Sequence, residues 1–188
     1  MMEADMFEIF KARAETASAE VHRFATKDQA LEFIIDFVRS DVPGDGASFN
    51  ALWADCPFLA GLEKRLISDR VRGLTFDVTR DRAATARIGI SQMDWAIANT
   101  GTLVQDATAV EQRLVSTLPN IHIAIVKTGE IVADLPALLA KADPRRATYI
   151  SFITGPSRTA DIERVLTIGV HGPERLIVVA VDESGGIH

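Results

Sequence analysis

Short runs of apolar, β-branched residues alternate along most of the chain with segments of helical periodicity. Runs of this kind predict strands, and the predicted strands cover residues 48–52, 74–78, 95–99, 103–105, 121–127, 149–154 and 176–181. Segments with helical spacing or composition cover residues 58–68, 80–88, 109–116 and 135–141. Strands that alternate with helices predict an α/β fold with a mostly parallel sheet and helices on both of its faces.

The first 46 residues have a different pattern, which predicts two helices. Residues 5–24 carry one apolar stripe at three- and four-residue steps, formed by Phe7, Phe10, Ala14, Ala17, Val21 and Phe24. Thr26 and Gln29 form a capping-box pattern that opens a second helix, and residues 42–46 form a Pro/Gly breaker. We expect an N-terminal helical extension over residues 1–46 and an α/β domain over residues 47–188. The extension either packs on the core or projects as a dimer arm.

Residues 149–182 stand out because they read as strand, turn, helix, turn and strand. Gly155-Pro156 ends the first strand, and Ser157 is placed to cap a helix whose first turn holds Asp161 and Glu163. A second turn over residues 169–173 precedes the last strand. This order predicts a βαβ crossover.

Composition and charge exclude several classes of protein. The chain has 188 residues with a net charge of −6, so no overall positive field favours nucleic acid or an anionic membrane. Its longest apolar run is about six residues, far below the roughly 20 of a membrane span. The acidic start argues against a secretory signal, and the single cysteine, Cys56, fits a reducing cytoplasm. One cysteine also cannot supply a four-thiolate iron–sulfur site. We therefore expect a cytoplasmic protein.

Two loops at the carboxyl ends of predicted strands are the candidate binding elements. Residues 99–102 (Asn-Thr-Gly-Thr) and 154–158 (Thr-Gly-Pro-Ser-Arg) offer hydroxyls and glycines where ligands of open α/β sheets bind. Ser157 and Arg158 at a helix start suit a phosphate or carboxylate, although a capping serine and an arginine in a first turn are also common without a ligand. His171 is either a general acid or base or a structural loop histidine. The histidines show no metal-ligand spacing, and the common dinucleotide and P-loop signatures are absent.

Two stretches resemble a known family. The run FITGPSRTADIERVLTIGVHGPERLIVVAVD, residues 152–182, resembles the C-terminal signature of the LUD-domain family, lactate utilization protein C group. The segment AIANTGTLV, residues 96–104, resembles that family's second motif. The resemblance implies a Rossmann-like three-layer α/β/α sandwich similar to the NagB/RpiA/CoA-transferase fold. It also implies a part in the oxidation of L-lactate to pyruvate, beside partner proteins that carry the iron–sulfur clusters.

The resemblance suggests one pocket and leaves the role of the chain open. The expected ligand-binding residues are Asn99, Thr100, Gly101, Thr102, Gly155, Ser157, Arg158 and Thr159, with His171 as a possible catalytic group and a small carboxylate or phosphate as ligand. The leading hypothesis is an accessory or small-anion-binding subunit that holds no cofactor or metal itself. The alternatives are an independent enzyme of the CoA-transferase or sugar-phosphate isomerase type, and a regulatory or scaffolding module. Relatives often have an acidic residue where Asn99 stands, so covalent CoA-transferase chemistry is in doubt.

Overall fold

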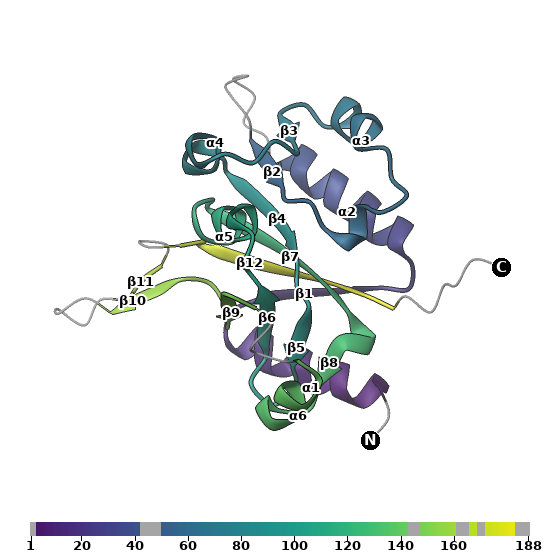
Figure 1. The fold of residues 1–188 in the computed structure, drawn as a ribbon, viewed down its shortest axis with the longest axis vertical. Coiled ribbons are helices and arrows are strands. Elements are labelled where there is room, and N and C mark those ends of the chain that lie inside the picture. Colours follow the sequence, from purple (N-terminus) through teal and green to yellow (C-terminus); the bar gives the residue numbers. More distant parts are fainter. Residues whose placement is uncertain (1–2, 42–49, 143–146, 161–165, 169–171, 183–188) are drawn as a thin grey trace.

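A parallel sheet of six strands forms the centre of the protein in a computed structural model that describes residues 3–41, 50–142, 147–160, 166–168 and 172–182. The order of the strands is β1-β12-β7-β4-β2-β3, and every neighbouring pair is parallel (Figure 1). The strands are β1 (Glu20–Phe24), β2 (Ala51–Trp53), β3 (Leu74–Thr75), β4 (Ile88–Gln92), β7 (Ile121–Lys127) and β12 (Arg175–Val181). The predicted α/β class and parallel sheet are confirmed.

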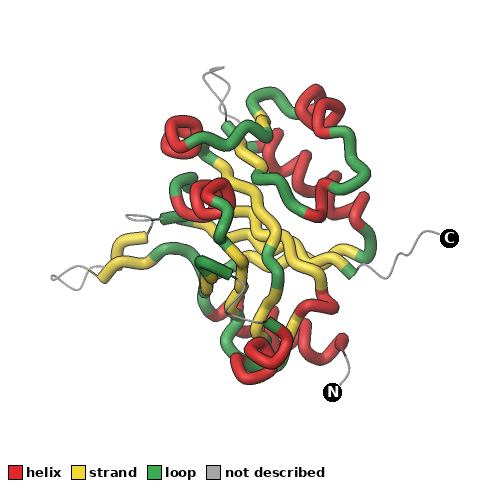
Figure 2. Tube along the Cα trace, in the orientation of Figure 1, coloured by secondary structure: helices red, strands yellow, loops and turns green. Residues whose placement is uncertain are grey.

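Two smaller sheets complete the strand inventory of the described residues. A mixed sheet has the order β8-β5-β6-β9, in which β5 and β8 are parallel and the other pairs antiparallel. Its strands are β5 (Trp95–Ile97), β6 (Thr102–Asp106), β8 (Ile131–Val132) and β9 (Ile150–Ile153). An antiparallel pair, β10 (Arg158–Ala160) and β11 (Leu166–Ile168), projects from the body of the molecule (Figures 1 and 2).

Helices cover one face of the large sheet. They are α2 (Lys27–Ser40), the 3₁₀ helix η1 (Pro57–Leu59) and α3 (Lys64–Arg70). The second predicted helix is confirmed as α2, because the Thr26 side chain accepts a hydrogen bond from the Gln29 amide and opens the helix there. Its buried side includes Ile34 and Ile35, which pack in the same core as Ile123 of β7.

The opposite face is covered by helices together with the mixed sheet. Helix α1 (Glu3–Thr16) and the mixed sheet share a core with β7 and β12, while α4 (Arg80–Thr85) and α5 (Val110–Thr117) share one with β2. Gly89 of β4 permits the approach of α5, since a Cβ there would lie 1.9 Å from the carbonyl oxygen of Val115. Helix α6 (Leu135–Lys141) packs on the outer face of the mixed sheet.

The single N-terminal helix expected over residues 5–24 is wrong. Helix α1 ends at Thr16, Ser18 turns the chain with a φ of 71°, and β1 then pairs with β12 along the edge of the large sheet. The apolar stripe misleads because Val21, two residues into the strand, continues the three- and four-residue spacing by chance. The division of the chain at residues 46 and 47 stays a prediction, although β1 places part of the first 46 residues in the sheet.

The βαβ crossover expected over residues 149–182 is also wrong. Strand β9 belongs to the mixed sheet and β12 to the large one, and the segments 158–160 and 166–168 are paired strands instead of helix. β-branched residues in both segments favour the extended state. The amide of Ser157 donates to the carbonyl of Pro173 at 2.8 Å, so it holds the returning chain. The sequence pattern does not predict the central strand β4. The predicted helix over residues 80–88 ends at the first residue of that strand, and residues 89–92 carry no predicted element.

Candidate functional site

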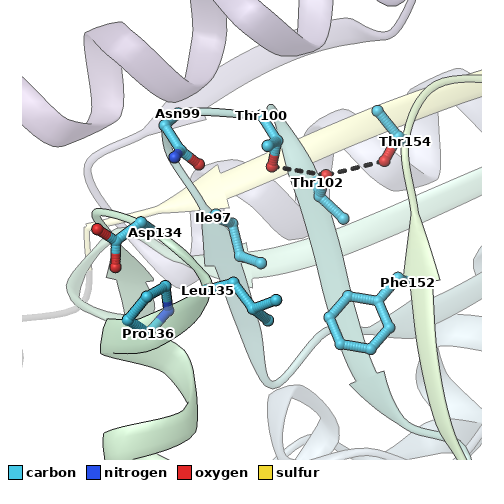
Figure 3. Close-up of a pocket in the computed structure, with 9 residues that line it drawn as sticks. All are labelled: Ile97, Asn99, Thr100, Thr102, Asp134, Leu135, Pro136, Phe152 and Thr154. Atoms are coloured by element: carbon cyan, nitrogen blue, oxygen red, sulfur yellow. Dashed lines mark hydrogen bonds between the residues drawn. The ribbon is translucent and has the colours of Figure 1, made fainter.

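A cavity of about 330 Å³ lies between the start of α6 and the outer face of the mixed sheet (Figure 3). Residues from the β5–β6 turn, the end of β9 and the first turn of α6 surround it. They are Ile97, Asn99, Thr100, Thr102, Asp134, Leu135, Pro136, Phe152 and Thr154. A volume of this size suits a small-molecule ligand.

Strand pairing places these side chains on one surface. Ile97 is opposite Thr102 in the β5–β6 pair, and Phe152 of β9 is opposite Val104 of β6. Because side chains alternate between the two faces of a sheet, Ile97, Thr102 and Phe152 share the outer face. The amide of Gly101 donates to the carbonyl of Ile97 at 3.0 Å and closes the turn that presents Asn99 and Thr100.

Three threonine hydroxyls form a connected cluster at the polar side of the cavity. Thr102 Oγ1 donates to Thr100 Oγ1 at 2.8 Å and lies 2.8 Å from Thr154 Oγ1, as the dashed lines in Figure 3 show. Thr102 is buried, with 6% of its surface exposed, whereas Thr100 and Thr154 are exposed. The buried hydroxyl therefore orients the two that meet solvent or a ligand.

The α6 side of the cavity combines a carboxylate with an apolar wall. Asp134 Oδ1 accepts a hydrogen bond from the amide of Ala137 at 2.9 Å and caps α6. Leu135 and Phe152 are 45% and 52% exposed, which is high for large apolar side chains. Among the described residues that line the cavity, Asp134 is the one ionisable group.

The structure brings together part of the predicted site. Asn99, Thr100 and Thr102 line the cavity, and Gly101 lies in the turn between them. Gly101 has a φ of 66°, and a Cβ there would lie 2.3 Å from the backbone nitrogen of Ala14. The glycine therefore permits contact with α1, on the side of the turn away from the cavity.

The other predicted loop lies against the end of α1. Gly155 has a φ of 70°, and a Cβ there would lie 2.1 Å from the carbonyl oxygen of Ala17. Arg158 Nη2 donates to that same oxygen at 2.8 Å and to Ser18 Oγ. These contacts fasten the loop to the carboxyl end of a helix, where a cation is favourable. Ligand roles for Gly155, Ser157, Arg158 and Thr159 stay predictions, and His171 lies outside the described residues.

Sequence reasoning missed the residues contributed by α6 and β9. Asp134, Leu135 and Pro136 read only as the start of a helix, and Phe152 as part of a buried strand. Their place at the cavity depends on the pairing of β8 with β5 and of β9 with β6, which no local pattern reveals. A carboxylate before a Leu-Pro pair signals a helix start, but it does not tell which strand the helix covers.

Two titratable groups with shifted pKa values lie away from the cavity, the buried His122 and the half-buried Cys56. Burial lowers the pKa of His122 to about 4, and its Nε2 lies 2.8 Å from Ser91 Oγ. Burial also raises the pKa of the Cys56 thiol, an effect that the neighbouring Trp53 side chain partly offsets.

Across the described ranges, no three His, Cys, Asp or Glu side chains are grouped to hold a metal ion. No helix in those ranges has the length and apolar character needed to cross a bilayer.

Comparisons with known proteins give a consistent picture. The model of the LUD domain family matches residues 7–181. Lactate utilization protein C of Exiguobacterium sp. is 38% identical over 113 residues, which are 57% of this chain and 49% of that protein. The protein of the same name from Halalkalibacterium halodurans is 37% identical over 109 residues, 55% of this chain and 47% of that protein. The matched region thus spans about half the length of these curated relatives.

One solved structure has the same fold. The crystal structure of a DUF162 family protein from Deinococcus radiodurans superposes with a TM-score of 0.67, covering 96% of this chain and 99% of that one. The two sequences are 18% identical. This likeness supports the arrangement of the six-stranded and mixed sheets.

Proposed function

The chain belongs to the LUD domain family, and from that premise we propose that it is a component of an L-lactate utilization system that oxidises L-lactate to pyruvate. The observation that carries the proposal is the similarity, at 38% and 37% identity, to two proteins named lactate utilization protein C. The motif at residues 96–104 lies beside the cavity, so one of the two stretches that resemble the family is also placed to contact a ligand.

In this proposal the chain is an accessory subunit that binds a small molecule and leaves electron transfer to its partners. Its single cysteine cannot hold a four-thiolate cluster, so iron–sulfur proteins of the same system would carry the redox centres. Asn99, Thr100 and Thr102 are the binding residues that the cavity supports most directly, together with Thr154. No cofactor is assigned to this chain.

Two structural details belong to the same proposal. The NagB/RpiA/CoA-transferase-like form of the fold would place the large sheet in the middle layer of a sandwich. The segment 1–46 would act as a part of the domain that packs on its core, because α1 and α2 cover opposite faces of the sheet.

Deletion of the gene in its native host tests the proposal. The deletion strain should lose growth on L-lactate as sole carbon source, keep growth on pyruvate, and recover on lactate when the gene is restored. A strain that has no other lactate oxidase and still grows normally on L-lactate would refute the proposed function.

A further inference from the structure

We propose that the cavity between α6 and β9 binds an uncharged ligand that carries an amide or hydroxyl group on an apolar body, and that it disfavours carboxylates and phosphates. The sequence alone suggested an anion. The inference deepens the proposed function by naming the ligand class of its pocket, but it does not require that the chain take part in lactate oxidation.

The charge of the residues that line the cavity favours an uncharged ligand. Asp134 contributes a carboxylate, and the described lining residues include no lysine, arginine or histidine. The guanidinium of Arg158, the cation that the sequence assigned to the site, is bonded instead to the carbonyl of Ala17 and the hydroxyl of Ser18. An anion in the cavity would therefore meet the like charge of Asp134, with no cation among the described residues of the lining to compensate it.

The direction of the threonine hydrogen bonds determines which hydroxyls can still donate to a ligand. A hydroxyl has one proton to donate, and Thr102 donates its proton to Thr100. The bond between Thr102 and Thr154 must then take its proton from Thr154. Thr100 keeps a free O–H donor, whereas Thr154 has no proton left to donate and presents acceptor lone pairs alone, so the cluster offers the cavity one donor beside a group that only accepts.

A neutral amide group matches this pair, because its carbonyl accepts and its N–H donates. The side chain of Asn99, at the same end of the cavity, is itself both donor and acceptor. A carboxylate group or a phosphate dianion group offers acceptors alone, so such a group can bond the Thr100 donor but leaves the Thr154 acceptor without a proton.

The apolar side of the cavity favours a ligand with an apolar body. Ile97, Leu135 and Phe152 face the cavity opposite the threonines (Figure 3). Leu135 and Phe152 keep about half of their surface exposed, and a ligand with an apolar body would cover part of it. A polar end and an apolar body together define the ligand.

A pair of probes that differ in charge tests the proposal directly. L-lactamide and L-lactate have nearly the same shape, but only lactate carries a charge. Titration of the full chain, followed by backbone amide NMR shifts at the cavity residues, should show L-lactamide binding at least about fivefold more tightly than L-lactate, which corresponds to one partly screened like-charge contact. Equal or tighter binding of lactate overturns the proposal, as does the absence of shifts with both probes.

Substitutions at Asp134 and Thr102 test which side chains cause the preference for L-lactamide over L-lactate. D134N keeps a helix cap, since asparagine caps as well as aspartate, and it should raise lactate affinity towards that of lactamide. The matched control is D69N, at an exposed position of α3, which should change neither affinity. T102V should weaken lactamide binding about fivefold or more, whereas T102S, which keeps the hydroxyl, should not. If D134N leaves the lactate-to-lactamide ratio unchanged, or T102V binds lactamide like T102S, the proposal fails.

The binding measurements and the growth experiment can fail independently of each other. Normal growth of the deletion strain on lactate would refute the proposed function and leave the binding measurements intact. Tight lactate binding would refute the ligand class and leave the lactate pathway open.

Discussion

Replacement of Gly101 by alanine tests whether the Asn-Thr-Gly-Thr turn is built around contact with α1. Gly101 combines a φ of 66° with a close approach, since a Cβ would lie 2.3 Å from the nitrogen of Ala14 and 2.8 Å from its Cα. Both neighbours are backbone atoms of a helix, which cannot rotate away as a side chain would. The substitution must therefore strain the turn and also move it or the helix.

The magnitude follows from two contributions. A left-handed conformation costs an L-residue about 1–2 kcal/mol. Overpacking of a well-packed interface costs about 1–3 kcal/mol more. We expect G101A to lower the free energy of unfolding by about 2–5 kcal/mol. Gly61 is a matched control because it has a φ of 77° but nothing within 4 Å of its added Cβ, so G61A should lose only about 1–2 kcal/mol.

Urea unfolding, followed by tryptophan fluorescence, measures both variants, because Trp53 is buried in the core and becomes exposed on unfolding. The difference between G101A and G61A isolates the contact with α1. If both variants lose the same free energy of unfolding, the turn does not depend on that contact, and Gly101 is not required for packing against α1.

Three further predictions concern groups outside the cavity. The unfolded chain protonates His122 below about pH 6.5 and the folded chain only below about 4, so the free energy of unfolding should fall by about 3 kcal/mol as pH drops through this window. H122Q should flatten that part of the urea-derived pH profile, and an unchanged slope contradicts the assignment. The Cys56 thiol, with its pKa raised by burial, should react with Ellman's reagent far more slowly in the native protein than in urea; equal rates would show that it is accessible. R158A removes the bonds to Ala17 and Ser18 and should cost about 1–2 kcal/mol in urea unfolding while lactamide affinity stays unchanged; a large loss of affinity with unchanged stability would restore Arg158 to the ligand site.

Elements whose signals are local could be predicted from the sequence. Strand β7 is a continuous run of β-branched and apolar residues, and α2 starts at a capping threonine and buries one apolar side. Both appear in the structure where the pattern placed them. Strand β1 could not be predicted, because its apolar residues continue the helical spacing of α1 and only its pairing with β12 makes it a strand.

The hairpin of β10 and β11 shows the same limit. Gly155-Pro156, Ser157 and the following acidic residues form a good local helix start, yet Ser157 bonds to Pro173, which is distant in sequence. A capping residue predicts a helix only when no tertiary partner competes for its backbone.

The residues that the β5–β6 turn contributes to the candidate site could be predicted from the sequence, but those from α6 and β9 could not. Asn99, Thr100 and Thr102 stand next to each other in a recognisable turn, so the sequence identified them. Asp134 and Phe152 reach the cavity through strand pairings between segments more than 30 residues apart, and the ionic character of the site changed with them. The sequence suggested an arginine beside hydroxyls, whereas the cavity has a carboxylate beside them.

Reconstitution of lactate oxidation tests whether this chain is a component of a lactate-oxidising system. The tagged chain is purified from lactate-grown cells, and the eluate is assayed for iron–sulfur proteins and for the conversion of L-lactate to pyruvate with an artificial electron acceptor. We expect iron–sulfur proteins to co-purify with the chain. Their lactate-oxidising activity should fall when this chain is left out and return when the purified chain is added. Full activity of the iron–sulfur proteins without this chain, or an eluate that contains none of them, would show that the chain is not a component of the lactate-oxidising system.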